Sequence, residues 1–470
     1  MARASWLAVS VLPVLVFACS GKPGECIDHR DCAATGGAQA GTGGEPAHTS
    51  GSGGQVTTAG TGGSSGGSAP QVEASAGEAG ARDVEVPGAA GAPDAAGAGN
   101  EPTPEVDPCS TFACGAGSCG LQHGLPVCDC TPAFTGKHCE LPRFETLGMP
   151  SGFEHSFATA ITSDGSTVYG YARDAESETQ ASFRWTHEAG SVVLAPAHYS
   201  ITGVSADGSV AAGERPNGTN ASTALRWSTI EGFTELGQPP GGDKSSSTTA
   251  TAISADGATI CGNAITASGT FAFRWTASAS MVKLPFPTGT GTEVTMQVHA
   301  ASADGRTIVG EFSDPSIAAK GFPFVWTSAG TRRLGTGQFG AAEALSADGS
   351  QIFGWFEDSG LKTAFRWTAE AGFTALDDTS MCGESLVKSV SADGRVAAGT
   401  CTSGSGMKAF VWDEARGVRS VETALNEFGM TLPAGRALWF VDALSGDGKT
   451  LVGRSLDESG RNEAWVARLD

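Results

Sequence analysis

The residue types that most often carry chemistry are dispersed along this chain of 470 residues. None of its eight histidines forms an HxxxH or HExxH pair, and no cysteines have the spacing of a zinc site. Residues 62–66 read Gly-Gly-Ser-Ser-Gly and match the GxSxG elbow of hydrolases, but no predicted strand precedes them and no helix follows. We interpret this match as chance. The sequence predicts no catalytic residue, no metal site and no cofactor.

The first nineteen residues indicate export. Arg3 gives a short positive start, and the apolar run over 7–18 has the length of a signal-peptide core but is too short to span a bilayer. The run ends Val16-Phe17-Ala18-Cys19, which resembles the lipobox of bacterial lipoproteins. The resemblance implies a signal peptide over 1–18, lipid attachment at Cys19 and a membrane anchor. An ordinary cleavable signal is the alternative.

Residues 19–107 are predicted to form the lipid anchor and a disordered linker. From residue 33 onward Gly, Ala, Ser, Thr and Pro dominate, and such a segment buries too little apolar surface to offset its ordering entropy. Ser20 after the lipidated Cys implies, by the same resemblance, an outer-membrane lipoprotein on the cell surface or the periplasmic face. The formal charge of −21 argues against nucleic acid as a partner.

An exported chain with twelve cysteines is expected to hold most of them in disulfides. Cys26 and Cys32 flank a short charged loop and are predicted to pair. Cys382 and Cys401 lie at nearly mirrored positions around a predicted hairpin, which favours a disulfide across two strands. Cys261 takes a place that is Val in sister repeats, so we interpret it as a buried thiol.

Six further cysteines cluster before residue 140. The stretch from Cys128 to Cys139, with Phe134 and Gly136 inside it, resembles the end of an epidermal-growth-factor-like module, which we place at 108–140. The resemblance implies three disulfides: Cys109–Cys119, Cys114–Cys128 and Cys130–Cys139. The acidic and amide residues of calcium-binding members are missing between the third and fourth cysteines, so no calcium is expected. We interpret the module as a rigid spacer, with a receptor-type contact as the alternative.

A single phrase recurs from residue 143 to residue 470. Seven Asp-Gly turns, each preceded by Ser-Ala or a close variant, are spaced by 43, 49, 48, 44, 45 and 54 residues, and begin at Asp164, Asp207, Asp256, Asp304, Asp348, Asp393 and Asp447. Each turn joins two apolar-alternating stretches, a strong hairpin signal. A third stretch carries Phe-x-Trp, as in Phe365-Arg-Trp367, and a fourth runs from Gly to Leu. Self-similarity at this period is typical of a propeller or solenoid.

These repeats predict an all-β fold: a seven-bladed β-propeller of four-stranded blades, with no helix between units. The last repeat ends at Asp470 without a fourth strand, while Phe144 to Gly148 looks like an unattached fourth strand. We therefore expect that segment to complete the seventh blade. The repeated Phe and Trp are expected in the core between blades. The phrase resembles the HAF repeat of bacterial extracellular proteins, over about residues 144–470; the resemblance adds fold rather than chemistry.

Two classes of function remain. The first is a non-catalytic, monomeric surface protein whose propeller binds an extracellular protein or glycan through loops. The second is an extracellular hydrolase or lyase with its site in the propeller funnel. A repeat that places unusual polar residues in the funnel would favour the enzyme; the insertions at 239–243, 285–298 and 426–439 show no acid–base set. Trp439 and Phe440 are the candidate ligand contacts, and the turn Asp residues are interpreted as turn formers.

Overall fold

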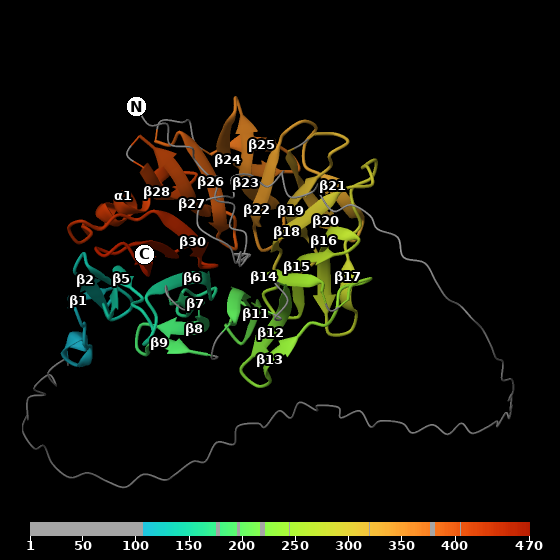
Figure 1. Cartoon of the computed structure of the whole chain (residues 1–470). Helices are drawn as coiled ribbons and strands as arrows, with labels where there is room; N and C mark the ends of the chain where they lie inside the picture. The colour runs from blue at the N-terminus through green and yellow to red at the C-terminus, as the bar shows by residue number, and fades with distance from the viewer. Residues whose placement is uncertain are drawn as a thin grey trace, which may run out of the picture. The chain divides into compact units, whose positions relative to one another are not determined.

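The structure, a computed structural model, describes residues 107–174, 179–194, 198–216, 221–243, 245–318, 320–376, 381–404 and 406–470. The predicted signal peptide, Cys19, the linker and the Cys26–Cys32 pair lie outside the described residues. The described part is nearly all β: a small Cys-rich module is followed by seven four-stranded sheets (Figure 1). No helix in these ranges is long and apolar enough to cross a membrane.

Each sheet is one antiparallel blade whose strands follow each other along the chain, as the hairpin pattern predicts. Blade 1 consists of β6 (His155–Ile161), β7 (Val168–Arg173), β8 (Gln180–Thr186) and β9 (Gly190–Val193), and blade 2 of β10 (Ser200–Val204), β11 (Val210–Pro216), β12 (Ser222–Ser228) and β13 (Gly232–Glu235). Blade 3 consists of β14 (Ser247–Ile253), β15 (Thr259–Thr266), β16 (Gly269–Thr276) and β17 (Ser280–Lys283), and blade 4 of β18 (Thr295–Ala301), β19 (Ile308–Ser313), β20 (Gly321–Thr327) and β21 (Gly330–Arg333). Blades 5 and 6 consist of β22 (Gly340–Leu345), β23 (Gln351–Asp358), β24 (Leu361–Thr368) and β25 (Gly372–Ala375); and β26 (Glu384–Val390), β27 (Val396–Ser403), β28 (Gly406–Asp413) and β29 (Gly417–Ser420).

The seventh blade joins the two ends of the repeat region. It consists of β30 (Phe440–Leu444), β31 (Thr450–Leu456), β32 (Asn462–Arg468) and, as its outer strand, β5 (Phe144–Thr146). Phe144 pairs with Ala467 and Thr146 with Trp465. The predicted closure is confirmed, and the first strands of neighbouring blades contact one another all the way round, from β6 through β30 and back to β6.

The repeated Asp-Gly turns tie the blades together at one end of the channel. The residue before each Asp, or Asp447 in blade 7, donates its backbone N–H to a carbonyl in the turn of an adjacent blade, at 2.8–3.0 Å, and these bonds form a complete circle. Inside each turn the Asp carboxylate accepts from the preceding Ser or Thr hydroxyl, as Asp207 does from Ser205 at 2.8 Å. The turn Gly adopts φ of 63–75°, and a Cβ on Gly257 would lie 2.7 Å from Val210 of the neighbouring blade. The interpretation of these Asp residues as turn formers is confirmed.

The core lies between blades. The Phe residues of the third strands are fully buried, among them Phe183, Phe273, Phe365 and Phe410, as expected. Arg274, between Phe273 and Trp275, donates to the carbonyl of Gly305 at 3.1 Å rather than to a turn carboxylate. Stacked blades thus bury both sheet faces.

The Cys-rich module contains η1 (Pro108–Thr111), β1 (Gly117–Gln122), β2 (Leu125–Cys130), β3 (Phe134–Thr135) and β4 (Leu141–Pro142). Its disulfides are Cys109–Cys119, Cys114–Cys128 and Cys130–Cys139, the pairs that the resemblance implied. Thr135 donates to the carboxylate of Asp470 at 2.9 Å, so the module contacts the end of the chain. In the propeller, Cys382 and Cys401 form the expected disulfide, and burial raises the pKa of the free thiol of Cys261 to about 12.

Candidate functional site

Every blade carries a β-bulge at the same place in its first strand. The pairing of first and second strands shifts register there, and one residue per blade is left out of the ladder. A bulge of this kind re-aims a side chain. The seven residues all line one cavity of about 300 Å³ in the channel, and they are Thr159, Thr202, Thr251, His299, Glu343, Lys388 and Asp442.

Two further residues per blade complete the cavity wall. The second of them, which directly precedes the Ser or Thr of the turn, is aliphatic in all seven blades. We call this ring the aliphatic collar, and it consists of Ile161, Val204, Ile253, Ala301, Leu345, Val390 and Leu444. No Phe, Tyr or Trp lines the cavity among the described residues. The channel therefore places a ring of polar side chains beside a ring of aliphatic ones.

On blades 1 to 3 the bulge residue is threonine, and we call these three residues the threonine arc. Thr159 donates its hydroxyl to the carbonyl of Ile201 at 2.6 Å, and Thr202 donates to Ala250 at 2.6 Å. Thr251 donates to the carbonyl of Val298 at 3.0 Å. Each hydroxyl proton is thus used to bind the next blade, and the threonine arc serves the fold.

On blades 4 to 7 the bulge residues are His299, Glu343, Lys388 and Asp442, which we call the charged arc. His299 Nδ1 lies 3.5 Å from Glu343 Oε1, and Lys388 Nζ lies 3.4 Å from Glu343 Oε2. The side chain of Lys388 is 33% exposed, whereas those of Glu343 and Asp442 are only 14% and 12% exposed. Lys388 is therefore the charged group of the arc that a molecule in the channel meets most readily.

The two carboxylates of the arc differ in their tendency to hold a proton. Burial raises the pKa of Glu343, but the nearby His299 and Lys388 and a hydrogen bond from Trp355 outweigh burial, so that its pKa lies below the ordinary value. Burial also raises the pKa of Asp442, and there Lys388 and Arg454 offset burial only in part, so that its pKa stays above the ordinary value. Blades 5 and 7, on either side of Lys388, thus present one carboxylate favoured as an anion and one that more readily binds a proton.

Residues of the second strands support the arc from behind. Arg454 of β31 donates to Asp442 Oδ1 at 2.7 Å, and its guanidinium lies over the ring of Phe440 at 4.6 Å. Glu311 of β19 lies close enough to His299 and Glu343 for both to influence its pKa, which burial raises. Charged residues of the second strands therefore lie behind both ends of the charged arc.

One of the two predicted ligand contacts, Phe440, lies beside the charged arc. Trp439 and Phe440 are both half-buried, and Phe440 contacts the arc through Arg454. Their contact with a ligand stays a prediction.

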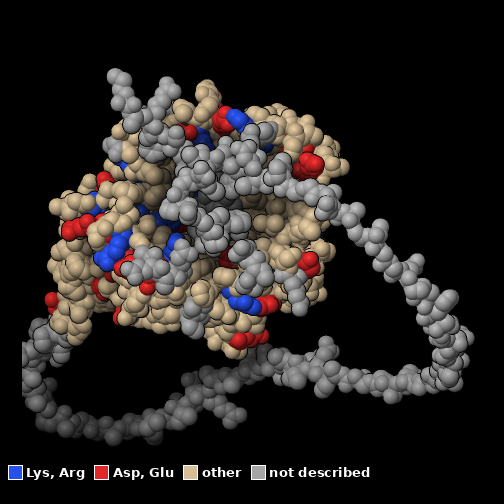
Figure 2. All heavy atoms as spheres, in the orientation of Figure 1, with Lys and Arg blue, Asp and Glu red and all other residues tan. Residues whose placement is uncertain are grey.

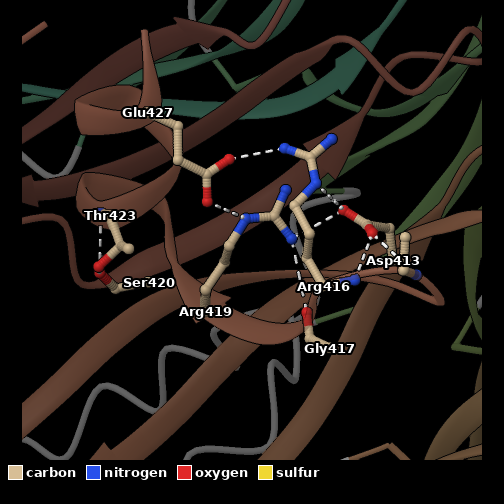
Figure 3. Close-up of polar contacts among 8 residues, drawn as sticks. Asp413, Arg416, Gly417, Arg419, Ser420, Thr423 and Glu427 are labelled. Carbon is tan, nitrogen blue, oxygen red and sulfur yellow. Dashed lines mark hydrogen bonds and ion pairs between the residues drawn. The ribbon is translucent and has the colours of Figure 1, made fainter. Parts of the chain in front are cut away.

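The insertion before β30 contains the helix α1 (Val421–Glu427), so the expectation of no helix between repeats is wrong here. Ser420 caps α1 by accepting from the N–H of Thr423. Figure 3 shows how Arg419 joins Asp413, at 2.8 Å, to Glu427, at 3.0 Å. Arg416 lies 2.6 Å from Glu427 and 3.4 Å from Asp413. These ion pairs join α1 to the ends of β28 and β29.

Sequence reasoning missed the charged arc because it searched the insertions. The signal was nevertheless present. Counting three residues back from the Ser or Thr of each Ser-x-Asp-Gly turn gives Thr, Thr, Thr, His, Glu, Lys and Asp in chain order. The described ranges contain no group of three His, Cys, Asp or Glu side chains suited to a metal ion.

The charged residues on one face of the molecule give a weaker signal than the channel. On the face drawn in Figure 2, the basic residues of the described part lie singly or beside acidic ones.

No family model matches the chain, and no curated protein matches it. Solved structures do. The propeller domain of the Trilobed protease from Pyrococcus furiosus is 11% identical over 67% of this chain and 95% of its own, with a TM-score of 0.48. An oligogalacturonate lyase in complex with manganese is 13% identical over 70% of this chain and 93% of its own, with a TM-score of 0.49. TolB from Acinetobacter baumannii is 12% identical over 55% of this chain and 63% of its own, with a TM-score of 0.38. At these identities and TM-scores the likenesses carry no argument about function, and the fold rests on the strand pairing.

Proposed function

We propose that this chain is an exported, lipid-anchored protein whose propeller binds a small polar extracellular ligand in its channel. The observation that carries the proposal is the charged arc. Four polar or ionisable side chains from four consecutive blades converge on a cavity of about 300 Å³. At the same position the other three blades carry threonines whose hydroxyl groups hydrogen-bond to the next blade. A cavity in which a few polar groups converge beside apolar side chains is typical of small-molecule sites.

The physical cost of the charged arc supports a functional role. Charged side chains that lose most of their hydration are costly, and threonine at the same bulge shows that the fold has a neutral solution. Four disulfides, all among the described residues, suit an oxidising compartment outside the cytoplasm, in keeping with the proposed export. In this proposal the EGF-like module and the linker hold a HAF-repeat propeller away from the membrane.

Thermal unfolding of the full chain with a panel of neutral sugars, amino acids and small organic acids tests the proposal. At least one class should raise the unfolding temperature of the wild type and of Thr202→Val, but not of Lys388→Met. Thr202→Val is the matched control, because it changes the same ring position on a blade of the threonine arc. A partner bound through the loops would instead survive Lys388→Met and be weakened by Trp439→Ala, and that result would overturn the channel as the site.

A second candidate function is catalysis in the same channel. It is favoured by one observation: Asp442, whose pKa lies above the ordinary value, and His299 belong to a polar set that the other blades lack. Groups of these two types carry out general acid–base catalysis. Incubation of the panel with the protein, followed by mass spectrometry, tests it. Turnover that His299→Gln removes while binding persists would make the protein an enzyme, and binding without turnover would leave it a binding protein.

A further inference from the structure

Two neighbouring blades present unused hydrogen-bonding capacity in the channel. Asp442 Oδ1 accepts from Arg454, but Asp442 Oδ2 is buried and has no hydrogen-bond partner among the described residues. In the same ranges, Lys388 Nζ makes one hydrogen bond, at 3.4 Å to Glu343, although an ammonium group has three N–H donors. The site thus offers one acceptor of negative character and spare donors of positive character, side by side on blades 6 and 7.

The aliphatic collar adds an apolar element next to these groups. Val390 lies two residues beyond Lys388, and Leu444 lies two residues beyond Asp442, and both line the same cavity. A ligand that matches all three features carries an ammonium group, a carboxylate and an aliphatic group close together.

We propose that the channel binds a free aliphatic α-amino acid as its zwitterion. Its ammonium group donates to Asp442, its carboxylate accepts from Lys388, and its side chain lies against Leu345, Val390 and Leu444 of the collar. This inference rests on the proposed function, because it names the ligand class of the same site.

Other small polar ligands fit less well. A sugar ring is commonly bound by stacking on an aromatic face, and the described cavity wall has no Phe, Tyr or Trp. A simple carboxylate would be attracted by Lys388 but repelled by Glu343 and Asp442. A simple amine would be attracted by Glu343 and Asp442 but repelled by Lys388. The zwitterion satisfies both signs, and a cavity of about 300 Å³ lies at the small end of ligand sites.

Calorimetric titration of the full chain with leucine and two truncated analogues tests the proposal. Isopentylamine lacks the carboxylate, and 4-methylpentanoate lacks the ammonium group. Because a charge-assisted hydrogen bond contributes more than a neutral one, each analogue should bind at least about tenfold more weakly than leucine. Equal binding of leucine and either analogue would overturn the proposal, and this comparison needs only the wild type.

Two variants then assign the partners. Lys388→Met should abolish the advantage of leucine over isopentylamine, and Asp442→Asn should abolish its advantage over 4-methylpentanoate. Thr202→Val should leave both advantages unchanged. An advantage that persists in the matching variant would contradict the assigned contacts.

The channel site and its amino-acid ligand can be disproved separately. If leucine does not bind but a sugar or an organic acid does, and Lys388→Met removes that binding, the amino-acid ligand is wrong and the channel site stands. If no compound of the panel binds in a manner that depends on Lys388, both are wrong.

Discussion

Blades 1–3 and blades 4–7 carry the same bulge at the same depth of the channel but fill it differently. On the first three, a threonine donates its hydroxyl proton to the next blade. On the other four, Glu343 lies between His299 and Lys388, and Asp442 contacts Arg454 of the second strand. The fold therefore needs the bulge but not the charge. Where a repeat protein departs from its neutral solution on consecutive units, the departure marks the place to look for function.

Removing the side chain of Glu343 should lower the stability of the charged arc the most. Glu343→Ala leaves Lys388 without its carboxylate partner and should lower the free energy of unfolding by about 3 kcal/mol, at the low end for a buried pair because Lys388 is partly exposed. Urea unfolding measures the change. Glu370→Ala, an exposed carboxylate on the same blade, is the control and should change stability by less than about 0.5 kcal/mol. Similar values for the two variants would show that the arc is not an energetic unit.

A pH series should separate two buried carboxylates, Glu214 and Glu343, by sign. Burial raises the pKa of Glu214, on blade 2, to about 7, and its Oε2 has no hydrogen-bond partner among the described residues. The folded state therefore holds a proton that the unfolded chain has released, and stability declines as the pH rises from about 4.5 through 7. Glu214→Gln should remove roughly 3 kcal/mol of that decline, as measured by urea unfolding at several pH values.

Glu343 provides the opposite case. Its lowered pKa means that its contribution to stability is present above the ordinary value and is lost as the pH falls through the folded-state pKa. Glu343→Gln should therefore flatten the acid limb and leave the decline toward pH 7 intact. The same pH profile for both glutamine variants would contradict the opposite pKa shifts of these two carboxylates.

Thr202→Val should give the smallest effect. The variant keeps the shape of the side chain but removes the hydrogen bond to the carbonyl of Ala250, at a cost of about 1 kcal/mol. Ligand affinity should change by less than about twofold, because the hydroxyl faces the next blade. A large loss of affinity in titration calorimetry would move the site toward the threonine arc.

The sequence predicts more of the fold than of the site, for a physical reason. The Asp-Gly turns and Phe-x-Trp strands repeat, so local sequence patterns are enough to predict seven blades. The missing fourth strand of the last repeat predicts that the segment beginning at Phe144 closes the ring. His299, Glu343, Lys388 and Asp442 are separated by 44, 45 and 54 residues, and only the stacking of successive blades makes them neighbours. Strict strand alternation also places Thr159 on the same face as Phe157, whereas the bulge turns it into the channel.

The most direct test of the charged arc as the site uses the aliphatic collar as a ring of reporters. Methyl NMR spectra of the full chain, labelled at Ile, Leu and Val, are recorded while unlabelled leucine is added. We expect the largest shifts at Leu345, Val390 and Leu444, beside the charged arc. Smaller shifts are expected at Ile161, Val204 and Ile253, beside the threonine arc. Shifts confined to the threonine side, or no collar shift with leucine or any other compound of the panel, would contradict this expectation.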